Sequence, residues 1–152
     1  MSAATNEIAI RRSGVLPATS LDRAARTFQA CVLSSAEVEG VKVDLSGVTV
    51  PDGLPVILDH EARARATVGT VIRTWREGDV IAAEVRLTRD PSVDWLIERI
   101  ADGTIRGVSA GFRVTRWGRG EGRVRVAERA ELLEVSITSF PADPRAQIRS
   151  ST

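Results

Sequence analysis

The chain has 152 residues, enough for one compact domain; we expect residues 1–152 to form a single domain, with residues 1–6 disordered. Its 21 Lys and Arg residues nearly balance 20 Asp and Glu residues, which argues against a general nucleic-acid binder, because affinity for phosphates needs a basic excess. A single Cys excludes an intrachain disulfide, and the sequence shows neither a signal peptide nor an 18-residue apolar run, so we expect a soluble intracellular protein.

The first half of the chain predicts strands and one clear hairpin. Strands are expected in residues 7–12, 26–35 and 55–59, and residues 41–45 are a candidate for a further short strand. The polar stretch 37–53 around residues 41–45 is expected to include a mobile loop. Residues 68–75 and 80–87 alternate in polarity and are joined by Arg-Glu-Gly-Asp, which predicts a β-hairpin.

The hydrophobic period then changes. Asp90 as N-cap and Pro91 at the first helical position open a helix over residues 91–102, and Gly103 ends it. Further strands are expected in residues 106–117, 123–129 and 131–140. Seven or eight strands and one helix predict a mainly β (α+β) fold: an antiparallel, closed or nearly closed barrel flanked by one or more helices, because closure removes exposed strand edges.

Ser109 stands in Gly-Val-Ser-Ala-Gly, which matches the G-x-S-x-G nucleophile elbow of α/β-hydrolases. The elbow requires a strand, a sharp turn and a helix, whereas here a helix and Gly103 precede a strand. An α/β-hydrolase also needs a His after its Ser, and the only His of this chain is His60. The match therefore does not indicate an α/β-hydrolase.

Ser109 can still be a nucleophile on a strand. Alternation places Val108, Ala110 and Phe112 on one apolar face, and Ser109 on the other with Gly107 and Gly111. Glycines in a strand often mark close approach by a ligand or another backbone, although a Ser in a Gly-weakened edge strand has the same pattern. A Ser nucleophile needs a base, and His60 is the one imidazole available, unless it only closes a hydrophobic strand. Alternation puts His60 on the face of Val56 and Leu58.

Glu134 is the first candidate for the acid that would orient His60. Alternation predicts that one face of this strand is apolar, with Leu133, Val135 and Ile137. The opposite face would then carry Leu132, Glu134, Ser136 and Thr138. A Glu in the middle of an apolar strand is costly unless it is paired, although a solvent-facing Glu would need no partner. Glu131 is the fallback acid, and Asp59 is a poor candidate because alternation points it away from His60. Oxyanion-hole donors are expected from the Pro-flanked loop after this strand, with the backbone N–H groups of Ala142 and Asp143 as candidates.

Two other site classes remain open. Cys31 could pair with His60 as a cysteine hydrolase, but nothing in its strand would lower the thiol pKa, and a buried structural Cys is common. A nucleic-acid module could use the arginines at 113, 116, 119, 123 and 125. Without interleaved exposed aromatics, these arginines indicate a solvated strand and turn instead.

Several segments together resemble a known family. They are "DLSG" before "LPVILDH", then "VGTVIRTWREGDVIAAEVRL", "WLIERIADGTIRGVSAGFRV" and "ELLEVSITSFPADPRA". In order and content they are similar to the HK97-type prohead maturation proteases of tailed bacteriophages, the caudovirus prohead serine proteases. The resemblance runs through most of the chain and is less specific in the first 40 residues.

The resemblance implies a seven-stranded barrel like that of the herpesvirus assemblins, with His60 as base, Ser109 as nucleophile and Glu134 at the acidic position. It implies a serine endopeptidase, without cofactor or metal, that cleaves the major capsid protein, its scaffold or delta segment, and itself. This would happen inside the assembling prohead in the bacterial host cytoplasm, with possible self-association and no specific nucleic-acid or membrane partner. The alternative is a catalytically idle capsid-assembly or scaffold protein that retains the protease fold.

Overall fold

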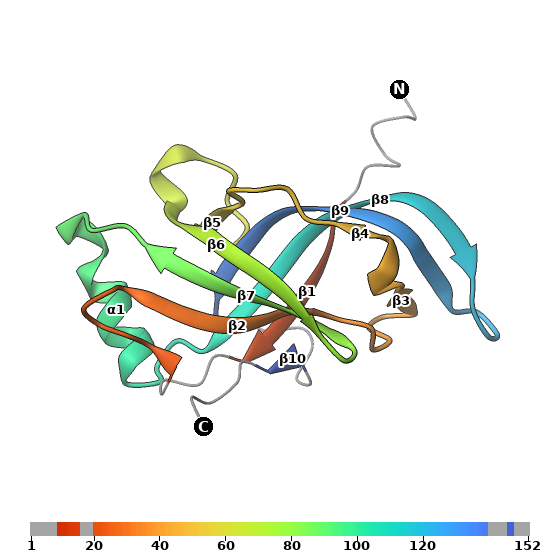
Figure 1. Cartoon of the computed structure of the whole chain (residues 1–152), viewed down its shortest axis with the longest axis horizontal. Coiled ribbons are helices and arrows are strands. Elements are labelled where there is room, and N and C mark those ends of the chain that lie inside the picture. The colour runs from red at the N-terminus through yellow and green to blue at the C-terminus, as the bar shows by residue number, and fades with distance from the viewer. Residues whose placement is uncertain (1–8, 16–19, 140–145, 148–152) are drawn as a thin grey trace.

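The structure, a computed structural model, describes residues 9–15, 20–139 and 146–147. Within these residues ten strands form one strongly curled sheet, and a short helix lies at one end of it (Figure 1). The strands are β1 (Ala9–Val15), β2 (Thr27–Ser34), β3 (Val41–Val43), β4 (Val48–Thr49), β5 (Pro55–Leu58), β6 (Thr67–Glu77), β7 (Val80–Leu87), β8 (Gly107–Arg119), β9 (Arg125–Thr138) and β10 (Ala146–Gln147). The helix is α1 (Asp94–Ala101), and the 3-10 turns are η3 (Leu45–Gly47), η4 (Ala64–Ala66) and η5 (Pro91–Val93).

The sheet is mixed, so the expectation of an antiparallel barrel is only partly confirmed. Its order is β10-β1-β8-β9-β5-β6-β7-β2, and β9 also carries β3 and β4. β9 pairs antiparallel with β8 but parallel with β3, β4 and β5, and β1 pairs parallel with β10. Sequence signals for hairpins reveal only antiparallel neighbours that a short turn joins. The parallel partners of β9 reach it through long connections, which leave no local signal.

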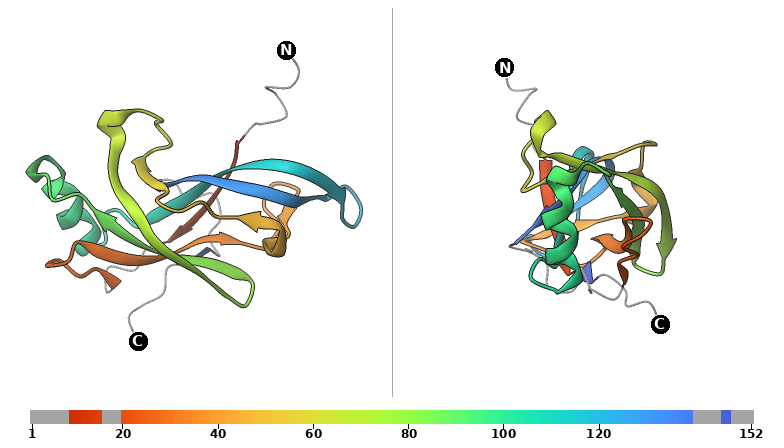
Figure 2. Two further views of the ribbon diagram at one scale, coloured as in Figure 1. Left: turned by 45° about the horizontal axis from the view of Figure 1, so that its top comes forward. Right: turned by 90° about the vertical axis from the view of Figure 1, so that its left-hand side faces the viewer.

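The sheet curls into part of a barrel (Figure 2). The hydrogen-bonded order of the described strands starts at β10 and stops at β2, although β1 and β10 lie beside β2. The expected number of strands, seven or eight, was too low, because β4 and β10 are only two residues long and have no counterpart among the expected strands. The curl brings the inner faces of distant strands onto one core, which includes Phe28, Val56, Val85, Val108, Ala110, Phe112, Leu132, Val135 and Ile137.

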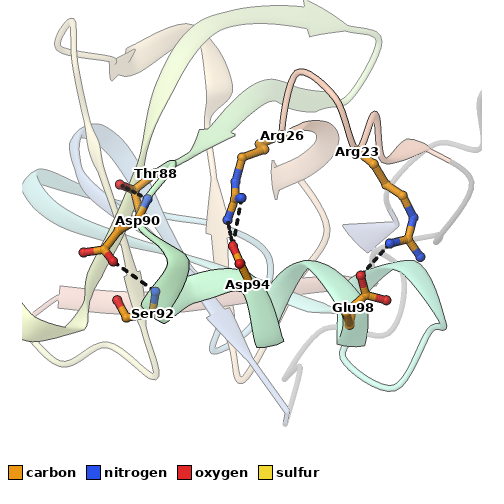
Figure 3. A network of polar contacts seen from close by, with 7 residues as sticks. All are labelled: Arg23, Arg26, Thr88, Asp90, Ser92, Asp94 and Glu98. Atoms are coloured by element: carbon orange, nitrogen blue, oxygen red, sulfur yellow. Dashed lines mark hydrogen bonds and ion pairs between the residues drawn. The ribbon is translucent and has the colours of Figure 1, made fainter.

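Helix α1 covers one end of this core with Leu96, Ile97 and Ile100, which are all buried. The expected helix over residues 91–102 is confirmed in place, but its first turn is the 3-10 turn η5. Asp90 caps that turn by accepting a hydrogen bond from the Ser92 backbone N–H at 3.0 Å. Two ion pairs on the helix surface, Arg26–Asp94 and Arg23–Glu98, tie α1 to the loop before β2 (Figure 3).

One further expectation needs correction. Residues 123–129 and 131–140 do not form separate strands, because β9 runs without a break from Arg125 to Thr138. The short strand expected at residues 41–45 is confirmed as β3, and the polar stretch 37–53 also contains β4; both strands pair with β9. The β6–β7 hairpin is confirmed. Residues 1–6, expected to be disordered, lie outside the described residues.

Among the described residues, no helix is long and apolar enough to cross a membrane.

Candidate active site

Three side chains that are far apart in sequence meet on the outer face of the sheet. Nε2 of His60 lies 2.9 Å from Oγ of Ser109, and Nδ1 of His60 lies 2.6 Å from Oε1 of Glu134. The imidazole therefore bridges a hydroxyl and a carboxylate through its two ring nitrogens. Of the two acids proposed as alternatives to Glu134, Glu131 instead bonds Arg113 at 2.9 Å, and Asp59 lies in the turn before His60.

Strand β9 lies between the strands that lead to Ser109 and to His60. Ser109 on β8 is paired with Ser136 on β9, and Ser136 is in turn paired with Ile57 on β5. Ser109 and His60 therefore do not project from neighbouring strands. The imidazole reaches Ser109 across β9, and for this reason residues of β9 contribute to the site.

His60 is not on a strand. β5 ends at Leu58, and Asp59 and His60 follow in a turn with φ values of 50° and 58°. Two successive non-glycine residues in the left-handed region are uncommon and strained. The turn breaks the alternation that placed His60 on the face of Val56. Val56 is in the core, while the ring of His60 lies over the outer face beside Ser109.

A β-bulge in β9 aims Glu134 at His60. Phe112 pairs with Leu132 and Gly111 pairs with Glu134, so Leu133 is an extra residue in β9. The bulge places Leu132 and Val135 in the core and leaves Leu133 37% exposed, which corrects the expected faces of Leu132 and Leu133. Bulges are frequent beside active sites because they re-aim side chains.

Gly111 makes room for the carboxylate. A Cβ atom at this position would lie 2.8 Å from Cδ of Glu134 and closer still to Oε1. Glycines beside a strand Ser predict space for a ligand or another backbone. For Gly111, the space is filled by the side chain of Glu134.

The site is largely shielded from water. Ser109 is 1% exposed, and the side chains of His60 and Glu134 are 12% and 14% exposed. A carboxylate only accepts hydrogen bonds, so the proton between Glu134 and His60 is assigned to Nδ1. Nε2 then presents a lone pair to the hydroxyl of Ser109. This arrangement can withdraw a proton from Ser109 and stabilise the resulting imidazolium.

The sequence of residues 53–152 matches the family model of the caudovirus prohead serine proteases. The chain belongs to this family. No curated protein matches the sequence. Among solved structures, the chain is similar to the bacteriophage T4 capsid assembly protease gp21, with a TM-score of 0.63 and 14% identity, over 88% of this chain and 98% of that one. At this identity the likeness shows a shared fold.

The sequence of this prohead protease did not predict a role for one polar residue of the site. Ser136 is fully buried; its hydroxyl donates to Oε2 of Glu134 at 2.7 Å and accepts from the backbone N–H of His60 at 3.0 Å. Alternation does place Ser136 on the face of Glu134. No sequence pattern shows that the turn at His60 folds back over it.

The remaining candidates lie elsewhere. Cys31 is buried on β2, while both ring nitrogens of His60 are engaged by Glu134 and Ser109. The arginines near the β8–β9 turn are partly engaged: Arg113 pairs with Glu131, Arg116 pairs with Glu128, and Arg125 stacks over Trp117.

The candidate oxyanion donors, Ala142 and Asp143, lie outside the described residues. In the part of the chain that the structure describes, no three His, Cys, Asp or Glu side chains gather as a metal site.

A mainly apolar pocket of about 490 Å³ adjoins His60 and Glu134. Its walls include Pro55, Ile57, Ala62, Ala64, Leu133 and Gly111. Leu133, the bulge residue, is one of the few large apolar side chains with substantial exposure. The same bulge therefore turns Glu134 toward His60 and Leu133 toward the pocket.

Proposed function

We propose that the protein is a serine endopeptidase that cleaves proteins of the assembling phage prohead. The observation that carries the proposal is the continuous contact from Ser109 through His60 to Glu134 in a chain of the prohead serine protease family. In this proposal Ser109 is the nucleophile, His60 is the general base and Glu134 holds the imidazole in the required tautomer.

The reaction follows from these contacts. Nε2 of His60 takes the proton of Ser109 while Oγ bonds to the carbonyl carbon of the scissile peptide, and the carbonyl electron pair moves to its oxygen. His60 then gives the proton to the leaving amine nitrogen as the C–N bond breaks. Water attacks the acyl-enzyme in the same way and releases Ser109. The backbone N–H groups of Ala142 and Asp143 remain our candidates for binding the oxyanion.

We propose that the apolar pocket beside His60 receives an aliphatic side chain of the substrate. Apolar lining next to a few polar groups is typical of a binding site. Leu133→Asp should raise KM about tenfold for a capsid-derived peptide with little change in kcat, because a small apolar subsite contributes on this scale. The matched control is Ile72→Asp, since Ile72 is 40% exposed on β6 and does not line this pocket. Equal effects of the two substitutions would contradict the subsite.

The substrates we propose are the propeptides of the scaffold and of the major capsid protein, and the protease itself, within the prohead in the host cytoplasm. Family membership supports this proposal, and so does the shared fold with the T4 protein, which is a capsid assembly protease. We also propose that residues 1–152 form one protease domain and that the curled sheet is a variant of the assemblin barrel.

We propose that the dilute monomer is nearly inactive. Ser109 is 1% exposed, so little of its surface is open to a peptide in this conformation. A small barrel also has a side-chain-filled interior, which leaves only a surface groove where an extended peptide binds weakly. Confinement within one shell would raise the effective concentration. The specific cleavage rate of a capsid-derived peptide should rise with enzyme concentration; a high, flat rate from nanomolar concentrations upward would contradict this.

The alternative is a catalytically idle assembly protein that keeps the fold. The intact hydrogen-bonded series from Ser109 to Glu134 favours the protease, because an idle scaffold has no physical need to bury these three polar groups together. Co-expression with a major capsid protein of the same phage separates the two functions. The mass of the capsid protein should fall with the wild-type protein and stay at full length with Ser109→Ala. Full-length capsid protein in both cases would support the idle alternative.

A further inference from the structure

Ser136 lies in the middle of the site, and its hydroxyl is bound to Glu134, the acid end of the series that runs from Ser109 through His60. It is fully buried on β9, is paired across the strands with Ser109, and is two residues from Glu134 on the same face. In the structure its hydroxyl contacts the carboxylate and the backbone of His60, rather than the imidazole ring.

The first contact sets the orientation of the carboxylate. Oε1 of Glu134 accepts from Nδ1 of His60, and Oε2 accepts from the hydroxyl of Ser136 at 2.7 Å. With each oxygen bound to a different partner, the carboxylate cannot rotate without losing a hydrogen bond. Loss of the Ser136 hydroxyl would leave Oε2 free to turn toward His60 or toward the pocket.

The second contact holds the backbone of His60. The turn at Asp59 and His60 has positive φ values at both residues, and such strained residues persist only where surrounding contacts hold them. β9 supplies two of these contacts. The backbone N–H of Asp59 donates to the carbonyl of Ile137, and the backbone N–H of His60 donates to Oγ of Ser136, both at 3.0 Å.

We propose that Ser136 is a positioning residue that fixes both the carboxylate and the turn from which the imidazole projects. A hydroxyl has one hydrogen to donate and lone pairs to accept, and Ser136 uses both functions in opposite directions. It thereby couples the position of Glu134 to that of His60, so that Nε2 keeps its lone pair on Ser109. The placement of Ser136 is independent of catalysis, whereas its effect on turnover rests on the proposed protease function.

Three substitutions separate hydrogen bonding from volume. Ser136→Ala removes the hydroxyl, Ser136→Cys keeps most of the volume with a poor hydrogen-bonding group, and Ser136→Thr keeps the hydroxyl. Ser34→Ala is the matched control, because Ser34 is also a buried Ser, but on β2 at the far end of the sheet order. If the extra methyl of Thr prevents folding, the comparison of Cys with Ala still decides between hydrogen bonding and volume.

The first readout is the imidazole of His60. Because the chain has one His, its imidazole ¹⁵N shifts report a single ring without assignment by mutation. At a pH where the ring is neutral, the wild type, Ser136→Thr and Ser34→Ala should carry the proton on Nδ1. Ser136→Ala and Ser136→Cys should show a mixture with the Nε2–H tautomer. Wild-type shifts in both the Ala and Cys variants, or restoration by Cys, would overturn the proposal.

The second readout is cleavage of co-expressed capsid protein and of a capsid-derived peptide. Ser136→Ala and Ser136→Cys should lower kcat by about tenfold to a hundredfold with little change in KM, since small misplacement of a catalytic group has effects of this order. Loss of activity with unchanged ¹⁵N shifts would contradict positioning. A tautomer shift in a protein that cleaves nothing would uphold the role of Ser136 and reject the protease function, so the two failures are distinguishable.

Discussion

The β8–β9 hairpin places a glutamate side chain against a glycine twice, with different results. Near the start of β8, Gly111 is the cross-strand partner of Glu134. Toward the turn, Gly118 is paired with Val126, and the side chain of the unpaired Glu128 lies against it. In both places a Cβ atom on the glycine would collide with the carboxylate. Glu134 reaches His60 and is 14% exposed, whereas Glu128 reaches Arg116 and is 40% exposed.

The difference shows what turns a polar pair into a candidate site. The exposed Arg116–Glu128 pair has alternatives in water, so its geometry is weakly constrained and its contribution to stability is about 0–1 kcal/mol. Glu134 is surrounded by His60, Ser136 and the sheet, so each of its hydrogen bonds is fixed. Both halves of the hairpin have a glycine beside a glutamate. They differ in the burial of the carboxylate and in Ser136, which binds the carboxylate of Glu134 in addition to its ion-pair partner.

The largest effect is expected at Ser109, the proposed nucleophile. Ser109→Ala should lower cleavage of capsid protein by roughly 10⁴–10⁶-fold, as loss of a serine nucleophile does in other triads. Thr115→Ala is the matched control, because Thr115 is an exposed hydroxyl on the same strand toward the turn. Peptide cleavage followed by mass spectrometry measures both variants. Comparable losses in the two would mean that the buried half of the hairpin has no special role.

The next largest effect is expected when the two glutamates of the hairpin, Glu134 and Glu128, are compared. Glu134→Gln should lower kcat by roughly 10²–10⁴-fold and leave the fold intact, because the amide NH2 can donate to Nδ1 and so favour the other tautomer, and a neutral amide does not stabilise the imidazolium. Glu128→Gln should leave cleavage unchanged. Circular dichroism checks folding, and steady-state kinetics measures turnover. If Glu134→Gln retains full activity, the orienting acid is another residue.

Substitution of the two glycines should also affect cleavage more at Gly111 than at Gly118, but the difference should be smaller than for the two glutamates. Gly111→Ala forces the carboxylate of Glu134 away from His60, and a displacement of this size should lower kcat by about 10²-fold. Gly118→Ala displaces only the exposed end of Glu128 and should change the free energy of unfolding by less than about 1 kcal/mol, with normal cleavage. Chemical denaturation and kinetics on the same preparations test both. Normal turnover in Gly111→Ala would show that Glu134 has room to move.

The smallest effect is expected at Asp44, which caps η3 beside the half of β9 toward the turn. Hydrogen bonds from the hydroxyl and the backbone N–H of Ser46 lower the pKa of Asp44 below its ordinary value of 3.8. The stabilisation is therefore present above pH 3.8 and is lost as the pH falls through the lowered pKa. Asp44→Ala should slightly lower the melting temperature near neutral pH, and the difference should shrink below pH 3.8. A difference that is constant with pH would exclude the ionised cap.

The sequence predicts well those features that depend on neighbours along the chain. The strand nature of Ser109, the β6–β7 hairpin and the helix after Asp90 all have local signals. Selection of Ser109, His60 and Glu134 depended on the single His, the glycines around the Ser and the mid-strand Glu. The structure brings these three side chains together.

The rest depends on contacts between distant segments. Parallel pairing of β5 with β9 leaves no turn signal, so neither the mixed sheet nor the position of β9 between Ser109 and His60 was predicted. Strict alternation also failed at the bulge of Leu133 and at the turn of His60, because a single inserted or left-handed residue reverses the faces of the residues after it. The role of Ser136 arises from both irregularities.

Covalent labelling of Ser109 tests the central claim most directly. Proheads that contain the co-expressed protein would be treated with a fluorophosphonate, which loses fluoride as its phosphorus bonds to an activated serine oxygen, and peptide mass spectrometry would locate the adduct. We predict one adduct, on Ser109, that disappears in Ser109→Ala and is strongly reduced in Glu134→Gln. Modification of a different serine, or no adduct on Ser109 in proheads that are cleaving their capsid protein, would contradict the account.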